Sequence, residues 1–331
     1  MYILSLSKQN IDMAVAEAQA ILGFNQATLN DRFLLIEDKF YDKDKLNKLA
    51  YTKYSYKLLF SEPFDSISNK VHEFNFDSEI NKSYKTVYVG LKDEELGKKI
   101  NNIIWNSLTT PKVDVVTPSQ QLFFICVGEN EKRIILCALR DWESNDKFEE
   151  RLPHKREGLK PISLHPRLAR CLVNLLGTER GTIVDPFCGT GGILLEGLLS
   201  GNKVKGYDIS DGMLDISRKN IESFNIEKEK YELENRDFFE NNLKINFLVS
   251  DLPYGKNTTN IADGFYLDFM LHLDKIIGKR AVIVVPDSVH IKQMFELHDF
   301  KNMKLIDTFT YYIHKSMTKL ICVINCDRLE C

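Results

Sequence analysis

The second half of the chain alternates short apolar runs with segments in which apolar residues recur every three or four positions. The short runs predict strands, and the helical spacing predicts helices between them. The expected strands are 182–185, 204–208, 231–236, 246–250 and 280–286, and the expected helices are 166–176, 191–200, 211–224 and 265–277. Because such alternation is typical of a parallel sheet covered by helices, we expect a doubly wound α/β domain. Strand patterns at 311–314 and 320–325 flank a polar turn and predict a closing antiparallel hairpin.

The first half of the chain lacks this regular alternation. Strands are expected at 2–6, 29–37, 56–60 and 86–91, and helical spacing predicts an amphipathic helix at 11–22 that ends at Gly23. Asp93 is placed to cap a second helix, which has its apolar residues on one face. Two strands at 121–127 and 133–139, joined around Gly128 and Asn130, predict a hairpin. This order indicates an α+β region.

The first strand of the α/β half ends in an aspartate and a glycine-rich loop. Asp185 closes the strand, and Gly189, Thr190, Gly191 and Gly192 lead into the next helix. Glycine has no Cβ, so a ligand can approach the backbone closely, and the start of a helix offers free N–H groups to an anionic group. The loop therefore predicts a site for a nucleotide, or for a nucleoside that also carries an anionic group.

Two further strand patterns also end in aspartate, at Asp208 and Asp251. The carboxyl ends of parallel strands meet at one edge of a sheet, so we expect these carboxylates to converge with Asp185. Asp208 is placed to accept hydrogen bonds from both hydroxyls of a ribose. Asp251 opens the sequence DLPYG, which follows its strand without a break.

The motifs together resemble a known class of enzymes. DPFCGTGG resembles the first motif, and DLPYG the fourth motif, usually written [DNS]PP[YFW], of class I methyltransferases that act on exocyclic amino groups and depend on S-adenosylmethionine. With PISLHPRLAR and the late HKSMTK, these motifs resemble the archaeal and eukaryotic tRNA guanosine N2-methyltransferases that carry a THUMP domain, especially those that modify nucleotide 10. The specific motifs lie within residues 161–320. Over the first half, the resemblance rests on length, order and pattern.

The resemblance implies a domain order. A ferredoxin-like α+β segment at 1–60 and a THUMP-like RNA-binding domain at 61–142 would precede a basic linker at 143–165. A Rossmann-like class I methyltransferase domain would fill 166–331. A length of 331 residues suits two or more domains, and 44% hydrophobic with 27% charged residues is typical of a soluble globular protein.

The resemblance also implies S-adenosylmethionine as the cofactor, without a metal. Asp208 would bind its ribose, Asp237 would accept from the adenine amino group, and the N–H of Phe238 would serve a ring nitrogen. Read alone, His165 is more often a residue that begins a helix. The residues expected around the cofactor are Leu164, His165, Asp185, Pro186, Phe187, Cys188, Gly189, Thr190, Gly191, Asp208, Ile209, Asp237, Phe238 and Asp251.

The catalytic group is expected in Asp251, Leu252, Pro253 and Tyr254. The lone pair of guanine N2 is delocalised into the ring, so the amine attacks well only when acceptors hold its hydrogens. Asp251 supplies one acceptor and a negative charge, and the carbonyl of Leu252 supplies another. Tyr254 offers a ring on which a flipped base stacks. Leucine stands where proline is usual, which keeps the carbonyl. A cysteine nucleophile for cytosine methylation would stand where Tyr254 is, which argues against that role for Cys188.

Charge adds an expectation about RNA. The formal net charge of −3 gives no global attraction to nucleic acid, so contacts must come from local patches. Basic residues outnumber acids between 151 and 170, and the HKSMTK segment is also basic; the alternative is a solvated linker and turn. The candidates for phosphate contact are Arg151, Lys155, Arg156, Lys160, Arg167, Lys315 and Lys319.

Other features bear on compartment and partners. Seven cysteines without a C-x-x-C pair indicate a reducing compartment. No stretch has the roughly 18 uninterrupted apolar residues of a membrane span, so we expect a cytoplasmic protein without a membrane partner. tRNA is the expected partner, and a small activator subunit is left open.

The leading expectation is therefore methylation of guanosine N2 in tRNA, at nucleotide 10, once or twice. Three alternatives stay open at this stage. One is another tRNA position, such as 6. A second is N6-adenine methylation of DNA or methylation of a protein glutamine, both of which use a similar fourth motif. The third is an RNA-binding protein whose methyltransferase domain has decayed.

Overall fold

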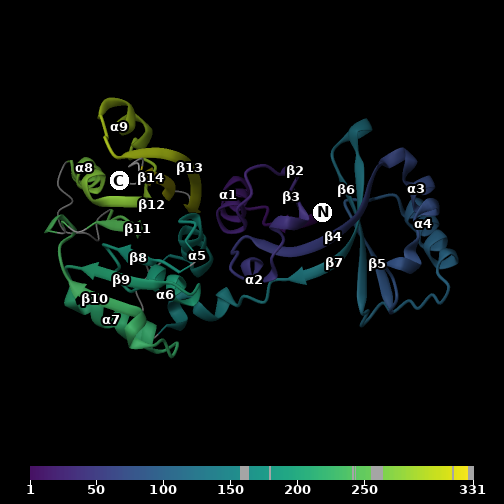
Figure 1. The fold of residues 1–331 in the computed structure, drawn as a ribbon, viewed down its shortest axis with the longest axis horizontal. Helices are drawn as coiled ribbons and strands as arrows, with labels where there is room; N and C mark the ends of the chain where they lie inside the picture. Colours follow the sequence, from purple (N-terminus) through teal and green to yellow (C-terminus); the bar gives the residue numbers. More distant parts are fainter. Residues whose placement is uncertain are drawn as a thin grey trace. The chain divides into compact units, whose positions relative to one another are not determined.

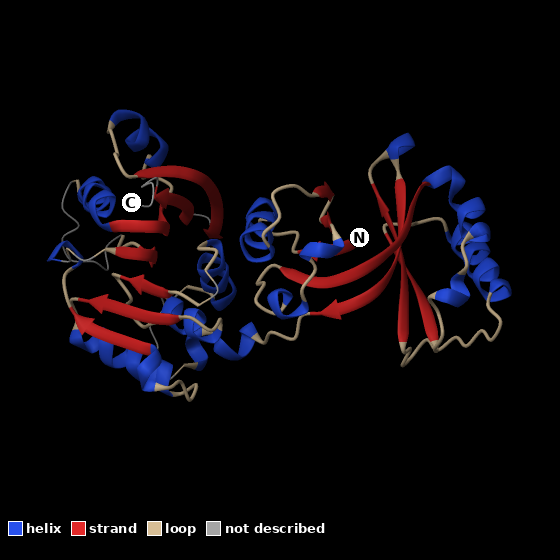
Figure 2. Cartoon of the chain, viewed as in Figure 1, coloured by secondary structure: helices blue, strands red, loops and turns tan. Residues whose placement is uncertain are grey.

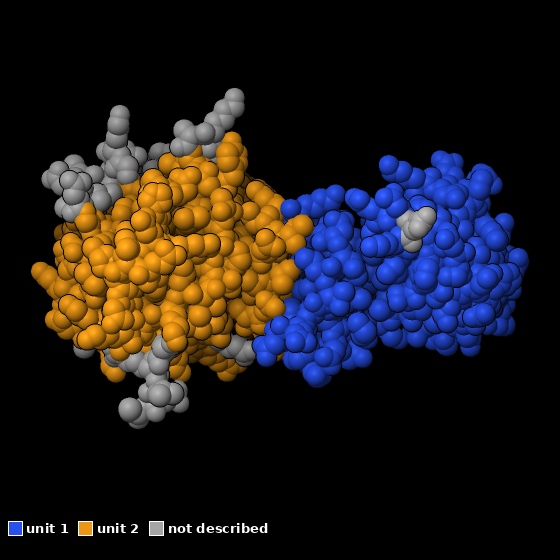
Figure 3. Space-filling model, turned by 90° about the horizontal axis from the view of Figure 1, so that it is seen from above, with its two compact units in different colours: residues 1–8, 24–46, 52–145 blue, residues 9–23, 47–51, 146–331 orange. Residues whose placement is uncertain are grey.

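The structure is a computed structural model that describes residues 1–156, 164–178, 180–240, 242, 244–254, 264–314 and 317–326. The chain divides into two compact units (Figure 3). Unit 1 comprises Met1–Lys8, Phe24–Leu46 and Thr52–Asn145, and unit 2 comprises Gln9–Gly23, Asn47–Tyr51 and Asp146–Cys331. The domain boundaries expected at 60, 142 and 165 remain predictions. Among the described residues, none of the helices combines the length and the apolar character needed to cross a membrane.

Unit 1 contains a seven-stranded sheet in the order β2-β3-β1-β4-β7-β6-β5. Its strands are β1 Tyr2–Leu6, β2 Thr28–Asn30, β3 Phe33–Ile36, β4 Thr52–Pro63, β5 Tyr84–Val89, β6 Gln120–Val127 and β7 Ile134–Glu143. The segment 29–37 is a hairpin of β2 and β3, with Asp31 at a φ of 56° in its turn. The hairpin of β6 and β7 is confirmed, with Gly128 at a φ of 83°.

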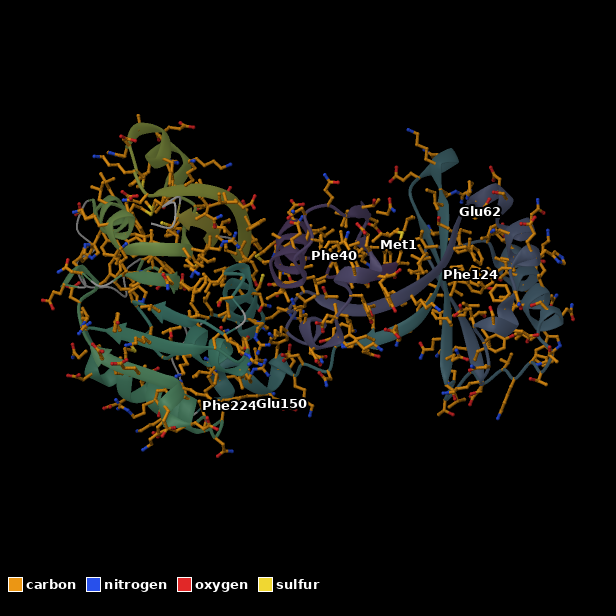
Figure 4. The ribbon with its side chains drawn as sticks, in the orientation of Figure 1. Met1, Phe40, Glu62, Phe124, Glu150 and Phe224 are labelled. Atoms are coloured by element: carbon orange, nitrogen blue, oxygen red, sulfur yellow. The ribbon has the colours of Figure 1, made fainter. Side chains whose placement is uncertain are left out.

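The helices of unit 1 are α2 Lys43–Leu46, α3 Ile67–Glu73 and α4 Glu94–Ser107. The predicted cap of α4 is confirmed, because Asp93 Oδ1 accepts a hydrogen bond of 2.9 Å from Leu96 N. The apolar face of α4 packs with α3 and with Phe124 of β6, which is fully buried (Figure 4).

Unit 2 contains a second seven-stranded sheet, in the order β10-β9-β8-β11-β12-β14-β13 (Figure 1). Its strands are β8 Thr182–Asp185, β9 Lys203–Asp208, β10 Tyr231–Asn235, β11 Ile245–Asp251, β12 Ile277–Pro286, β13 Met303–His314 and β14 Met317–Cys326. Neighbours from β10 to β12 are parallel, whereas β14 runs antiparallel to both β12 and β13. The doubly wound fold and its closing hairpin are thus confirmed.

Unit 2 combines this sheet with α-helices (Figure 2). They are α1 Ile11–Leu22, α5 Pro166–Leu175, α6 Gly192–Leu199, α7 Asp211–Glu222, α8 Phe265–Ile276 and α9 Ile291–Leu297. In α6, a β-carbon at Gly197 would lie 3.1 Å from Val204 and 3.7 Å from Ile183. In α8, Phe269 packs in one cluster with Val184. Since Ile183 and Val184 point to opposite faces of β8, α6 and α8 cover opposite faces of the sheet.

Helix α1 belongs to unit 2 although it lies near the start of the chain. Its Glu17 is fully buried. Glu17 Oε1 accepts hydrogen bonds from Ala50 N at 2.8 Å and Asn174 Nδ2 at 2.6 Å, and Oε2 accepts from Tyr51 N at 2.9 Å. One buried carboxylate therefore joins α1, the segment 47–51 and α5.

We predict that Glu17→Ala destabilises the protein. It leaves three buried N–H donors without their acceptor, and an unsatisfied buried donor costs about 1–3 kcal/mol. We expect the free energy of unfolding to fall by about 3 kcal/mol, partly offset by removal of the buried charge, as measured by urea denaturation. The control Asp12→Ala changes an exposed residue of the same helix and should shift it by less than about 0.5 kcal/mol. Equal midpoints for the two variants would contradict this role.

Candidate active site

The glycine loop between β8 and α6 is held by its own backbone and by neighbouring elements. Cys188 N donates to Tyr207 O at 2.9 Å, and Gly191 N donates to Cys188 O at 2.8 Å. Gly189 has a φ of 50° and Gly191 a φ of 76°. These are left-handed conformations that glycine adopts without a steric penalty, so the loop geometry follows from the sequence.

Asp208, at the end of β9, hydrogen-bonds to this loop. Its Oδ2 accepts from Gly189 N at 3.0 Å, and its Oδ1 accepts from Ser210 N at 2.9 Å. The next residue, Ile209, has a side chain that is 75% exposed. An acceptor and an exposed apolar surface therefore lie side by side at the edge of the loop.

Asp185 lies beneath the loop and is 1% exposed. Its Oδ1 accepts hydrogen bonds from Ser250 Oγ at 2.6 Å and from Phe187 N at 3.2 Å. Burial raises the pKa of Asp185 to about 7; these two hydrogen bonds lower it, and the nearby carboxylates of Asp251 and Asp208 raise it. The three aspartates that end β8, β9 and β11 thus lie close enough to interact, as expected.

Leu252 stands where the usual double proline has its first proline, and its backbone N–H has a role that proline cannot fill. Its backbone N–H donates to Val284 O at 3.0 Å, a bond that proline cannot make. Its side chain is 1% exposed and packs in the core beneath α8. The next carbonyl, of Pro253, accepts a 3.0 Å hydrogen bond from the hydroxyl of Tyr266. Partners from β12 and α8 therefore hold the backbone of the DLPY turn.

Asp251 forms an ion pair with Lys319 of β14. Lys319 Nζ lies 2.9 Å from Asp251 Oδ1 and 2.7 Å from Oδ2, and Lys319 is 1% exposed. The same nitrogen lies 4.1 Å from the centre of the Tyr254 ring. The sequence predicted that Lys319 contacts phosphates. The structure instead buries its charge against Asp251, because β14 pairs with β12, the neighbour of β11. Lys315 lies outside the described residues.

Two other predicted phosphate contacts, Arg151 and Arg156, are also buried. Arg151 Nε lies 2.8 Å from Glu196 Oε1, and Arg151 Nη2 lies 2.7 Å from Asp146 Oδ1. Arg170 Nη2 lies 2.8 Å from Glu196 Oε2. Arg151 therefore neutralises carboxylates inside unit 2 rather than offering its charge at the surface. Lys155 is exposed and Arg167 is partly exposed, whereas Lys160 lies outside the described residues.

Arg156, another of the predicted phosphate contacts, is 7% exposed. Its Nε donates to Arg151 O at 2.8 Å, but Nη1 and Nη2 have no hydrogen-bond partner among the described residues. A β-carbon at Gly192 would lie 3.0 Å from Nη1, so this end of the guanidinium lies beside the first residue of α6. A buried guanidinium whose terminal nitrogens have no hydrogen-bond partner in the described part of the chain, next to the positive end of a helix dipole, suits an anionic ligand group.

The remaining residues that were predicted to contact the cofactor differ in how far they are buried. His165 is the N-cap of α5; its Nδ1 accepts from Arg167 N at 3.2 Å, and burial lowers its pKa. Phe238 is 1% exposed and stacks on Phe269 at 4.8 Å. Asp237 is exposed, and its Oδ1 accepts from Phe239 N at 3.0 Å. Leu164 is partly exposed, Pro186 and Thr190 are buried, and Phe187 is partly buried against Phe238.

Cys188 is 6% exposed, and burial raises the pKa of its thiol far above the usual value. A buried neutral thiol is a poor nucleophile, which agrees with the argument from the fourth motif. Ser250 and Tyr266 were missed by the sequence analysis. Ser250 had a usable signal, because it is a polar residue that follows the apolar run Phe247 to Val249 and directly precedes Asp251.

The sequence is similar to those of known methyltransferases. Residues 153–315 match the family described as RMKL-like, methyltransferase domain. The tRNA (guanine(10)-N2)-dimethyltransferase of Methanothermobacter thermautotrophicus is 27% identical over 290 residues, which cover 84% of this chain and 83% of that protein. The probable tRNA (guanine(10)-N2)-dimethyltransferase of Methanothermococcus thermolithotrophicus is 32% identical over 164 residues, 47% of this chain and 95% of that protein.

A solved structure supports the fold over nearly the whole chain. The crystal structure of TrmN from Thermus thermophilus has a TM-score of 0.55 at 14% sequence identity, and the match covers 98% of this chain and 99% of that one. At this identity the likeness concerns the arrangement of elements alone.

We predict that Gly206→Ala disturbs the glycine loop from below. A β-carbon at Gly206 would lie 2.4 Å from Leu194 Cδ1 and 3.0 Å from Cys188 Sγ. Such overpacking costs about 1–3 kcal/mol, which thermal unfolding would show as a lower Tm. The matched control is Gly212→Ala in α7, whose β-carbon would meet only Ser210 Oγ at 3.8 Å. It should keep or raise the Tm, because alanine favours a helix by about 0.5–1 kcal/mol over glycine.

Proposed function

This chain belongs to the tRNA guanine N2-methyltransferase family, and from that premise we propose that it methylates N2 of the guanosine at nucleotide 10 of tRNA, to the dimethylated product. The protein is a methyltransferase that uses S-adenosylmethionine and acts on guanine N2 in tRNA. The names of the curated relatives support position 10 and a second transfer. When bound, S-adenosylmethionine supplies an electrophilic methyl group.

One observation carries the assignment of the site. Ser250, the residue before Asp251, donates its 2.6 Å hydrogen bond to Asp185, the residue that opens the glycine loop. The acceptor proposed for the amine is therefore linked by one side chain to the loop proposed for the cofactor. This arrangement supports a reaction between two ligands that meet at the carboxyl ends of β8 and β11.

The residues present fit the cofactor. Gly189 and Gly191 let a ligand approach the backbone closely, and Asp208 keeps lone pairs that can accept from ribose hydroxyls. The exposed Ile209 offers an apolar surface for the adenine. Nη1 and Nη2 of Arg156, which have no partner among the residues that the structure describes and lie beside the start of α6, match the carboxylate at the methionine end.

The DLPY turn fits the amine of the target base. Asp251 and the carbonyl of Leu252 would each accept one N–H of guanine N2, which orients the amine and localises its lone pair. The carboxylate of Asp251 would also stabilise the positive charge that develops on N2 while the N–C bond forms and the S–C bond of the donor breaks; the proton that N2 then loses would pass to solvent. The ring of Tyr254 would stack on the base once it has left the RNA stack, a contact worth about 1–3 kcal/mol in single-strand binders.

Docking of the tRNA is proposed for the surface residues that remain. Lys155 and Arg167 are candidates for phosphate contacts, which position an RNA without reading its sequence. Residues 61–142 are proposed as a THUMP-like RNA-binding domain because of the order in which their strands and helices follow one another.

We predict that the product of the reaction is a dimethylated guanosine in tRNA. An unmodified tRNA transcript incubated with the enzyme and S-adenosylmethionine, then digested and analysed by mass spectrometry, should yield N2,N2-dimethylguanosine at nucleotide 10. The matched control carries inosine at that position, which differs from guanosine only by lacking the amine, and should stay unmethylated. N6-methyladenosine, or unchanged methylation of the inosine tRNA, would overturn the proposal.

We predict that Asp251→Asn lowers kcat by roughly 10²–10³-fold, because it removes a charged acceptor that acts where positive charge develops. Binding of S-adenosylhomocysteine, measured by calorimetry, should change little, which also shows that the variant is folded. The exposed Asp215→Asn in α7 is the control and should keep its activity. A kcat for Asp251→Asn close to that of the wild type would remove Asp251 from the chemistry.

Arg156→Gln tests the carboxylate contact. Loss of a charge-assisted hydrogen bond of about 1.5–3 kcal/mol should weaken S-adenosylhomocysteine binding roughly 10–100-fold. Binding of 5′-methylthioadenosine, which has no carboxylate, should not change. The neighbouring Lys155→Gln, which is exposed, should alter neither affinity. Equal weakening of both ligands by Arg156→Gln would show that Arg156 acts on the fold of the loop instead.

A further inference from the structure

We propose that Lys319 is a positioning residue for the methyl transfer, which holds Asp251 ionised and orients both Asp251 and Tyr254 toward the target base. This inference rests on the proposed function, because it assumes that these two side chains meet the guanine. It assigns Lys319 a part in the reaction instead of the phosphate contact that the sequence suggested.

The contact geometry is that of a built pair. Lys319 Nζ reaches both carboxylate oxygens of Asp251, at 2.9 and 2.7 Å, so the plane of the carboxylate has one defined orientation. Lys319 is 1% exposed, whereas the side chain of Asp251 is 16% exposed, so the ammonium group is enclosed while the carboxylate keeps some access. Burial of an ammonium group is costly unless it is paired, so the pair is maintained by the burial itself.

Strands position the pair. Lys319 lies opposite Pro286 in the antiparallel pairing of β14 with β12, and Asp251 lies opposite Val284 in the parallel pairing of β11 with β12. Groups on a sheet are held more precisely than groups on loops. The β12 strand therefore sets the distance between the two charges.

The charges around Asp251 show what Lys319 does. Burial raises the pKa of Asp251, and Lys319 lowers it through its charge and its hydrogen bonds. Among the described residues, Asp185 and Tyr266 interact electrostatically with this carboxylate, and Tyr254 lies beside Lys319; the first is acidic and the other two are phenols. Without Lys319, burial would act unopposed, and protonated Asp251 would become common at higher pH.

The pair still leaves Asp251 able to work. Each carboxylate oxygen has two lone-pair sites, and Lys319 uses one on each, so further sites remain for an N–H of the base. A carboxylate opposite an ammonium group is a weaker base but a charged acceptor over a wide pH range. The geometry therefore points to Asp251 as an electrostatic stabiliser of the amine.

The same nitrogen also orients Tyr254. It lies 4.1 Å from the ring centre, within the range of a cation–π contact. Since Lys319 occupies one face of the ring, a base can stack only on the other. One buried cation thus determines which face of Tyr254 meets the base and where the acceptor for N2 stands.

The test compares Lys319→Met, which removes the charge, with Lys319→Arg, which keeps it. We would measure kcat and KM for tRNA between pH 5.5 and 9 at saturating S-adenosylmethionine. Lys319→Met should lower kcat at pH 7 by roughly 10-fold or more and move the acid limb of its pH profile up by about 1–3 units, the effect of removing an opposite charge within about 4–6 Å. Lys319→Arg should return the acid limb toward the wild-type position. The exposed Lys301→Met is the matched control and should behave as wild type.

A double-mutant cycle separates this role from a structural one. In the Asp251→Asn background, Lys319→Met should lower kcat much less than it does in the wild type, because the charge that Lys319 serves is gone and only its contact with Tyr254 is left to lose. This double variant buries no unpaired charge, so it can be compared even where Lys319→Met alone unfolds. Independent losses in the two variants, or a Lys319→Met profile with the wild-type acid limb, would overturn the inference. A wild-type enzyme that leaves guanine N2 unmethylated would instead refute the proposed function, which the product analysis shows separately.

Discussion

A carboxylate that is withdrawn from water must find donors or a cation, and four of the described carboxylates of unit 2 show how this requirement is met. Glu17 collects three N–H donors, Glu196 meets two arginines, Asp185 accepts from Ser250 and Phe187, and Asp251 faces Lys319. Apart from the contact of Asp185 with Phe187, each of these contacts joins elements that are distant in the sequence. The same physical requirement therefore holds the helices on the sheet and arranges the reactive end of β11.

The parts of the fold that were predictable are those that depend on local periodicity. Strands and helices of the α/β half were found because buried strands and amphipathic helices leave different spacings, and the convergence of Asp185, Asp208 and Asp251 followed from the direction of parallel strands. The role of charged residues was less accessible. Arg151 and Lys319 were taken for surface groups because their partners, Glu196 and Asp251, lie 45 and 68 residues away in the chain.

Two further features lay beyond sequence reasoning for the same reason. Nothing in the pattern of 11–22 shows that this helix is anchored by donors from 47–51 and from α5. Leu252 looked like a departure from a motif, and only the pairing of β11 with β12 reveals that its N–H has a partner, Val284 O. Long-range pairing, which local propensity does not encode, decides both cases.

The placement of α1 has a consequence for biosynthesis. The chain passes from one unit to the other five times, at 8/9, 23/24, 46/47, 51/52 and 145/146. On the ribosome, the apolar face of α1, with Met13, Ala14 and Ile21, emerges early, but α5 follows only after some 150 further residues. Unit 1 can close during translation, whereas the catalytic unit waits for its carboxyl-terminal half. The segments of the two units thus alternate along the sequence, and a gene fragment that begins at residue 146 would lack the parts of unit 2 at 9–23 and 47–51.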